Sequence, residues 1–405
     1  MFFNIVNLFK DFVSIIKADA LIIIPLIFLC ADYFGTWPYY WGLVLVPVMV
    51  MKSSRTIRTD KNLSLIILFS CTYSIIAFLN GYFNEALGNT IFYSVYPAVF
   101  YMVGVYLGRK YRKNIIEILI LFPIILSIYP VFMGIQDILT NQFVNVTREL
   151  FDKNGNYVGS ATLLGTKVSL IISFCASLMF PIKNTKERIL QLIMFVFFVL
   201  GITLTLHLVS RTGLFLAAIC LLTSIIFNYK YLTKSQYLLI TLGGASFIYL
   251  YGDLLLTNLS ISEEAYIYRS DHGSTIAGGG GRVDIWIKSI GIVLTEPFGI
   301  PEIQRTMFNY AHNLWLDFSI TAGLIPLILF LRITYRYIKS FIRFYKLETN
   351  IILKSLILTY NIALLLQCSV EPVADGCMPF YFYIFLLFGI THYYEKNDSM
   401  YILCQ

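Results

Sequence analysis

The chain has 405 residues, of which 58% are hydrophobic and 13% are charged, and its mean hydropathy is +0.74. A soluble globular domain carries about twice that share of charged residues, so the composition excludes a soluble protein. Apolar stretches of roughly 20 residues, separated by short polar breaks, favour spanning helices over barrel strands. The expected fold class is an all-α integral membrane protein.

The first residues after Met1 place Asn4, Asn7, Asp11 and Ser14 on one side of a helix and apolar residues on the other. This pattern predicts an amphipathic helix at the membrane surface. No small-residue cleavage site follows the next apolar run, so we expect an uncleaved first span. The hydropathy pattern predicts twelve spans, at 18–35, 38–51, 63–80, 90–107, 115–135, 161–181, 189–208, 212–227, 237–256, 312–331, 351–370 and 379–393.

Basic residues gather in alternate breaks between these spans, and 22 of the 30 lysines and arginines fall on one side. The positive-inside rule makes that side cytoplasmic and places both termini there. The net charge of +7 then reflects topology, and no nucleic-acid partner is expected. Seven scattered cysteines without paired spacing indicate neither a disulfide framework nor a metal site, and no cofactor is expected. Eight basic residues are predicted on or near the other face: Arg148, Lys153, Lys167, Arg211, Arg269, Arg282, Lys288 and Arg305.

We expect one polytopic domain over 1–405 with two extracytoplasmic loops, at 136–160 and 257–311. The second is the longest polar interruption of the chain and contains a run of four glycines that ends at Gly281. Apolar spacing after this run predicts a helix that begins near Arg282 and ends at Glu296-Pro297. If the protein is an enzyme, the chemistry is expected in the stretch from Tyr268 to Pro326.

Two arginines are predicted at the starts of helices. Ser210 is placed to cap a helix whose first turn contains Arg211, and Arg282 opens the helix after the glycine run. A guanidinium beside exposed helix amides is suited to bind a phosphate or diphosphate. The alternatives are an arginine that reaches lipid headgroups at 211, and at 282 one that stacks on Trp286.

His312 and Asn313 open the predicted span 312–331. A helix N-terminus opposes protonation, which favours a neutral imidazole able to act as general base. The alternative is an interfacial histidine in an aromatic belt, the assignment made for His207 and His392, while His272 is a weaker rival for the base. Asp317, Glu371 and Asp375 are acids that could orient His312, and further substrate contacts are expected from Lys167, Asn313, Arg305 and Trp286.

Three ordered motifs carry a resemblance over roughly residues 206–326. They are Ser-Arg-Thr-Gly at 210–213; Gly281, Arg282 and Trp286 followed by Pro297 and Gly299; and His312-Asn313 followed by Gly323. In this order they resemble the superfamily of O-antigen polymerases (Wzy-like) and O-antigen ligases (WaaL-like) of bacterial envelopes. The last motif departs from the usual pattern because Pro326 stands where glycine, threonine or tyrosine is typical.

The resemblance implies a GT-C-like, metal-independent glycosyltransferase of the bacterial inner membrane, with its active site on the periplasmic face. Arg211 and Arg282 would hold the diphosphate of an undecaprenyl-diphosphate-linked oligosaccharide, and His312 would deprotonate the acceptor hydroxyl. The expected function is polymerisation of repeat units into O-antigen, a part of lipopolysaccharide biosynthesis. Membrane lipids and a polysaccharide chain-length regulator are the other expected partners.

Two alternatives remain open at this point. A ligase would transfer the finished glycan to lipid A-core by the same chemistry. A lipid-linked oligosaccharide flippase or transporter would also have many spans, but it should place polar residues near the midplane of two matching halves.

Overall fold

The computed structural model describes residues 2–31, 37–53, 59–82, 87–140, 145, 147–152, 155–179, 185–232, 234, 236–238, 241–242, 249, 282–305, 311–348 and 350–403. By its internal contacts the chain divides into two compact units, and the single polytopic domain expected from the sequence stays a prediction. The first comprises 1–14, 116–281 and 350–367, and the second comprises 15–115, 282–349 and 368–405.

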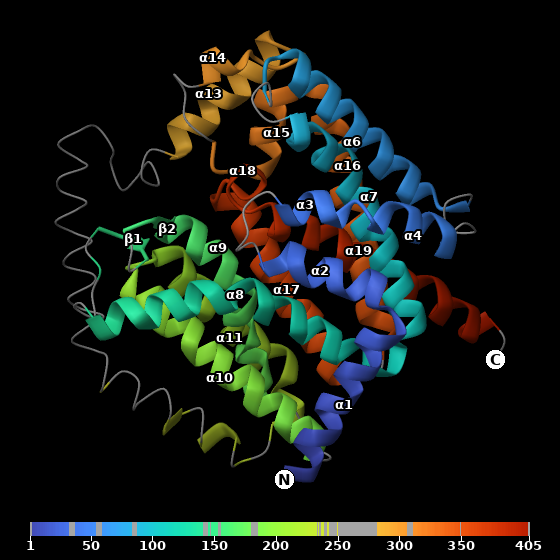
Figure 1. The fold of residues 1–405 in the computed structure, drawn as a ribbon, viewed down its shortest axis with the longest axis vertical. Helices are drawn as coiled ribbons and strands as arrows, with labels where there is room; N and C mark the ends of the chain where they lie inside the picture. Colours follow the sequence, from blue (N-terminus) through green and yellow to red (C-terminus); the bar gives the residue numbers. More distant parts are fainter. Residues whose placement is uncertain are drawn as a thin grey trace. The chain divides into compact units, whose positions relative to one another are not determined.

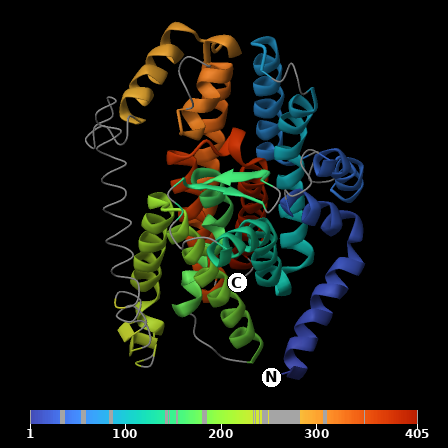
Figure 2. The same ribbon diagram turned by 60° about the vertical axis from the view of Figure 1, so that its left-hand side comes forward.

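The first unit contains helices and one two-stranded sheet, drawn as arrows in Figures 1 and 2. The strands pair in antiparallel fashion, with Glu149 opposite Ser160. Ser160 ends the second strand and caps the next helix by accepting a hydrogen bond from Leu163 N at 3.4 Å. The elements are α8 (Ile115–Thr140), β1 (Glu149–Phe151), β2 (Tyr157–Ser160), α9 (Ala161–Ile172), the 3-10 helices η2 (Ser173–Met179) and η3 (Tyr229–Tyr231), α10 (Thr185–His207), α11 (Arg211–Asn228) and most of α17 (Ile351–Val370).

The second unit is organised around buried aromatic side chains. Phe318 packs against Tyr73 at 4.7 Å between ring centroids, against Phe330 at 4.9 Å and against Tyr381 at 5.6 Å. Edge-on contacts of this kind stabilise beyond the area that they bury. They join α15 to α6, α16 and α19. This unit comprises the end of α1 (Phe2–Ala18), α2 (Ala20–Ala31), α3 (Trp37–Gly42), α4 (Leu45–Lys52), α6 (Lys61–Leu79), α7 (Leu87–Lys110), η1 (Arg112–Asn114), α13 (Arg282–Thr295), α14 (Glu302–Arg305), α15 (Leu314–Ala322), α16 (Leu324–Leu347), α18 (Val373–Gly376) and α19 (Met378–Leu403).

Seven helices in the described ranges are long and apolar enough to cross a membrane. They cover the predicted spans 63–80, 90–107, 115–135, 161–181, 189–208, 212–227 and 351–370. The chain is thus an all-α protein embedded in a membrane. Most of the span predicted at 237–256, and residues 257–281 and 306–310 of the loop predicted at 257–311, lie outside the described residues. Helix α13 confirms the helix expected after the glycine run. The span predicted at 379–393 forms part of the longer α19.

Two of the twelve predicted spans are broken into shorter helices. The 109° bend at Asp19 separates α1, the predicted surface helix, from α2, which lies in the first predicted span, and the buried carboxylate of Asp19 accepts hydrogen bonds from Lys52 at 2.6 Å and Lys110 at 2.7 Å. The prediction at 38–51 is wrong because α3 and α4 have only 6 and 8 residues. The prediction at 312–331 is wrong because the chain breaks at Gly323 between α15 and α16.

The turn that follows α13 is hydrogen-bonded to the break at Gly323. Figure 1 labels the helices α13, α15 and α16 that this junction connects. Gly323 has φ 82° and ψ −162°, a region that is essentially restricted to glycine. Leu324 N donates to Pro297 O at 2.8 Å and Ile300 N donates to Ile320 O at 2.9 Å. The side-chain Nδ2 of Asn80, which follows α6, donates to both Phe298 O and Thr321 O. The turn and the helix break therefore hold each other by backbone hydrogen bonds.

Replacing Gly323 by alanine should unfold this junction. The added Cβ would lie 2.0 Å from Pro297 O, and the backbone angles are unfavourable for any residue with a side chain. We expect a loss of about 3 kcal/mol or more, measured as a lower melting temperature of the detergent-solubilised protein. Gly291→Ala is the matched control because that Cβ meets nothing within 4 Å inside α13, and alanine there should be neutral or stabilising. Equal effects of the two changes would contradict the interlock.

Candidate active site

Arg282 is the first residue of α13, where the sequence predicts a helix start. Its Nη2 lies 3.6 Å from Oε2 of Glu371, and the arginine side chain is 29% exposed. Because the carboxylate of Glu371 is almost fully buried, this ion pair is screened far less than a surface pair. Arg282 is thereby held at the edge of a protected site with part of its guanidinium open.

His312, in the loop that precedes α15, lies near the same carboxylate. Its Nδ1 lies 3.9 Å from Oε2 of Glu371. This Nδ1 is buried and has no hydrogen-bond partner in the part of the chain that the structure describes. One carboxylate oxygen thus faces both the guanidinium and the imidazole, which brings two of the three predicted catalytic residues together.

The backbone of His312 is left-handed, with φ 52°, and its two neighbours hold it there. Asp317 accepts from Ala311 N at 2.9 Å through Oδ1 and from Asn313 N at 3.3 Å through Oδ2. Trp286 Nε1 donates to Ala311 O at 2.8 Å. A residue with a side chain adopts this conformation at a cost of about 1–3 kcal/mol and keeps it only where the surroundings impose it. Asp317 and Trp286 are therefore positioning residues for His312.

Asn313 links this loop to the segment that carries Glu371. Its Oδ1 caps α15 by accepting from Leu316 N at 3.2 Å, and its Nδ2 donates to Ser369 O at 3.3 Å. Ser369 lies in the last turn of α17, two residues before Glu371, which begins the short connection between α17 and α18. The cap of one helix thus sets the register between the imidazole and the carboxylate.

The imidazole of His312 is neutral at physiological pH. Burial lowers its pKa to about 4, and the positive charge of Arg282 acts in the same direction. His312 lies in the loop before α15, outside the seven candidate spanning helices. The sequence also predicts a neutral imidazole, but on the ground of the helix dipole. In the structure the two causes are burial and the charge of Arg282.

Arg211 and Lys167 belong to the first unit. Arg211 is exposed at the first position of α11, and Ser210 caps that helix by accepting from Gly213 N at 3.4 Å, as the sequence predicts. Val209, with φ 50°, makes the tight turn that precedes the cap. Lys167 is buried in α9. That these two residues join Arg282 and His312 around one substrate stays a prediction.

The remaining predicted residues are placed as follows. Arg305 ends α14, and nothing is described of its side chain. His272 lies outside the described residues. Trp286 and Asn313, expected to contact substrate, use their donors on the loop that carries His312. No three His, Cys, Asp or Glu side chains gather as a metal site within the described ranges.

Sequence reasoning missed or misjudged several polar residues. Glu371 was one acid among three, and only the fold brings it to Arg282. His207 is fully buried and its Nε2 lies 2.7 Å from Asp137 Oδ2, a contact that the sequence did not indicate. His392 contacts Asn62 Nδ2 at 3.2 Å and two carboxylates. The placement of both histidines at the membrane interface stays a prediction. The spacing of His392 and Glu395, three residues apart on one helix, was the available signal.

Removing the charge of Arg282 should raise the pKa of His312. Arg282→Gln leaves burial as the remaining cause, so the pKa should move from about 4 toward the ordinary value of 6.5. Glu371→Gln should move it the other way, because an anion 3.9 Å away favours the imidazolium. Titration of histidine signals by NMR in detergent measures both, and the exposed Lys113→Gln is the control. The site described above would be wrong if both changes shifted the pKa in the same direction.

Comparison of the chain with protein-family models finds no match, and comparison with curated proteins finds no significant match. The O-antigen resemblance therefore rests on the three motifs in this chain. Arg282, Trp286, Gly299, His312, Asn313 and Gly323 from those motifs come together in the second unit, and any function is to be argued from their arrangement.

Proposed function

We propose that this protein is a membrane glycosyltransferase that polymerises lipid-diphosphate-linked oligosaccharides into a surface polysaccharide of the O-antigen type. The observation that carries the proposal is the single buried carboxylate of Glu371, which faces a guanidinium at 3.6 Å and a neutral imidazole at 3.9 Å. A cation for a leaving diphosphate and a base for an incoming hydroxyl are the two groups that such a transfer requires.

His312 supplies the base. With Nδ1 protonated and directed at Glu371, Nε2 presents its lone pair to a sugar hydroxyl, as in other carboxylate-histidine pairs. The acceptor oxygen attacks the anomeric carbon of the donor while its proton passes to Nε2. Glu371 then stabilises the imidazolium that forms. The 3.9 Å separation is long for a hydrogen bond, and bound substrate would be expected to tighten it.

Arg282 supplies the cation. As the bond between the anomeric carbon and the diphosphate oxygen breaks, negative charge develops on the leaving lipid diphosphate. A guanidinium has five N–H donors, and Nη2 alone is the atom that faces Glu371 at 3.6 Å, so other donors can serve the phosphate oxygens. The resemblance adds Arg211 as a further diphosphate contact, and Lys167 is a third candidate because an ionisable residue within a predicted span is often functional.

The proposed setting is the bacterial inner membrane, with both termini cytoplasmic and the site on the periplasmic side. The distribution of basic residues supports this orientation, because the cationic breaks between spans fall on one side. The proposed protein partner is a chain-length regulator. The lipid-linked donor itself is proposed to reach the site from the membrane.

Incubation of the purified full-length protein with its lipid-linked repeat unit tests the proposal. We expect a ladder of products, reduced about 10²- to 10⁴-fold in rate by His312→Ala and about 10²- to 10³-fold by Arg282→Gln. Glu371→Gln should also slow the reaction, since it removes the charge that stabilises the imidazolium. Lys113→Gln, an exposed change, should leave the rate unaltered.

The other outcomes decide among the alternatives. An adduct on lipid A-core in place of a ladder would identify a ligase. Lipid-linked repeats that accumulate on the cytoplasmic face of cells carrying the His312 variant would identify a flippase. A ladder that is unaffected by both His312→Ala and Arg282→Gln would contradict the assignment of the site.

A further inference from the structure

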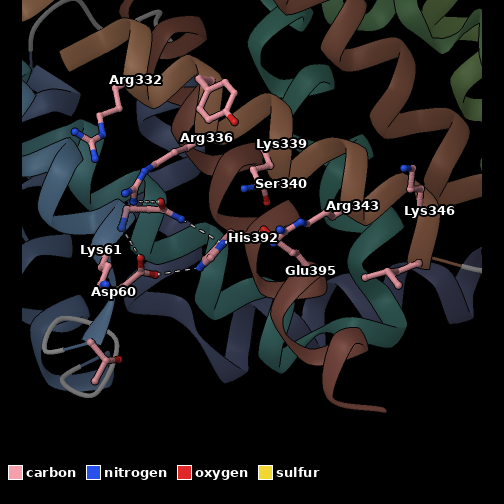
Figure 3. Close-up of a pocket in the computed structure, with 14 residues that line it drawn as sticks. Asp60, Lys61, Arg332, Arg336, Lys339, Ser340, Arg343, Lys346, His392 and Glu395 are labelled. Carbon is pink, nitrogen blue, oxygen red and sulfur yellow. Dashed lines mark hydrogen bonds and ion pairs between the residues drawn. The ribbon is translucent and has the colours of Figure 1, made fainter. Parts of the chain in front are cut away.

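A second polar site lies on the cytoplasm-facing half predicted for α16, and it belongs entirely to the second unit. A pocket of about 840 Å³ lies between α16, the start of α6 and the second half of α19. Figure 3 draws the residues that line it. Its 14 lining residues include six lysines and arginines and two carboxylates, so these groups carry an excess of four formal positive charges. The pocket is therefore built for an anion.

Five of the six cations are arranged on one face of α16, and the sixth, Lys61, begins α6. Arg332, Arg336, Lys339, Arg343 and Lys346 recur every three or four residues along α16. Arg343 lies 19 residues beyond Leu324, about 28 Å along the helix from the break at Gly323. The pocket is thus separate from the site formed by Arg282, His312 and Glu371.

The acids in the pocket are already engaged. Asp60 caps α6 and accepts from Tyr101 OH at 2.8 Å, and Glu395 pairs with Arg343. Arg336 donates to Asn62 Oδ1 at 2.8 Å, and His392 lies between the two acids, 3.5 Å from Asp60 and 3.4 Å from Glu395 (Figure 3). These bonds shape the floor of the pocket.

Four cations remain after these pairs are formed. They are Lys61, Arg332, Lys339 and Lys346, and none has a carboxylate partner among the described residues. All four side chains are exposed to the pocket mouth or its rim. Four cations without acids around one cavity would repel one another in the absence of an anionic ligand.

The neighbouring face of α16 is apolar. Leu331, Tyr335, Ile338 and Ile342 are exposed, at 40–65% of their surface. Each precedes a cation of the pocket by one residue, which turns the apolar stripe about 100° away from the charged one on a helix. A ligand that fits both faces has a phosphate at one end and hydrocarbon beside it. A soluble phosphate would use the pocket alone.

We propose that this pocket binds the phosphate of an anionic phospholipid, whose acyl chains lie along the apolar stripe of α16. Basic pockets at helix ends on the cytoplasmic side bind such headgroups through several lysines and arginines at once. The lipid would act as a permanent ligand that screens the four cations and holds the ends of α6, α16 and α19 together. The proposal is independent of the proposed function, since it uses none of the residues at Arg282, His312 or Glu371.

The test uses the full-length protein in a non-ionic detergent, titrated with phosphatidylglycerol in mixed micelles and followed by native mass spectrometry. The triple variant Arg332→Gln, Lys339→Gln, Lys346→Gln should bind phosphatidylglycerol about tenfold or more weakly. The control is Lys17→Gln, Lys113→Gln, Lys234→Gln, which removes the same charge from exposed lysines elsewhere. Its affinity should stay within about twofold of the unchanged protein.

Two further arms identify the source of the phosphate. Zwitterionic phosphatidylcholine should bind weakly, and sodium pyrophosphate at matched phosphate concentration should fail to displace phosphatidylglycerol. Ile338→Ser with Ile342→Ser should weaken binding of the lipid while leaving the charged pocket intact. Displacement by pyrophosphate would overturn the proposal in favour of a soluble anion, and equal loss in both triple variants would overturn the pocket as the site.

Discussion

The arrangement of the candidate active site depends on the left-handed backbone at His312. This conformation is unfavourable for histidine, so it persists only because Asp317 and Trp286 occupy the amide and carbonyl groups on either side of it. Both restraining groups are on helices, α15 and α13, and helices move less than loops. The loop thereby acquires the rigidity of the helices around it, and the imidazole is presented at a fixed angle to Glu371. A base that must meet a hydroxyl within hydrogen-bond distance needs this kind of support.

The interlock at Gly299 and Gly323 extends the same rigidity to Arg282. A Cβ at Gly299 would lie 2.7 Å from Thr321 O, and one at Gly323 would lie 2.0 Å from Pro297 O, so each glycine admits the backbone of the other segment. Both glycines are among the residues that carry the family resemblance. Their position explains the spacing of those motifs without any contact to substrate. The motifs thus contain residues of two kinds. Arg282 and His312 are proposed to act on substrate, whereas Gly299 and Gly323 join the turn after α13 to the break before α16.

Local features of this site were predictable from sequence and long-range ones were not. The start of α13 at Arg282 and the Ser210 cap follow from nearby residues, so short-range rules find them. The neutral state of His312 was predicted from a local helix dipole, but burial and the charge of Arg282 cause it, and both arise only on folding. The break at Gly323 was missed because the apolar run continues through it and hydropathy averages over single residues. Glu371 lies far along the chain from His312, and no periodicity links the two. The partners of His207 and His392 were missed for the same reason, since Asp137 and Asp60 reach them only through folding.

Helix α16 shows how one sequence pattern serves two environments. Its first half, after Gly323, carries apolar residues, and its second half carries a cation every three or four positions beside an apolar stripe. Hydropathy alone places the end of a span at residue 331 because charge rises there, yet the helix continues to Leu347. It continues because lysine and arginine stems remain compatible with an apolar neighbour while their charged ends turn toward polar partners such as Asn62 and Glu395. The basic residues that end the predicted span at 331 are therefore the residues that line the basic pocket. One helix, α16, thus begins beside the candidate active site and carries the basic pocket along its later turns.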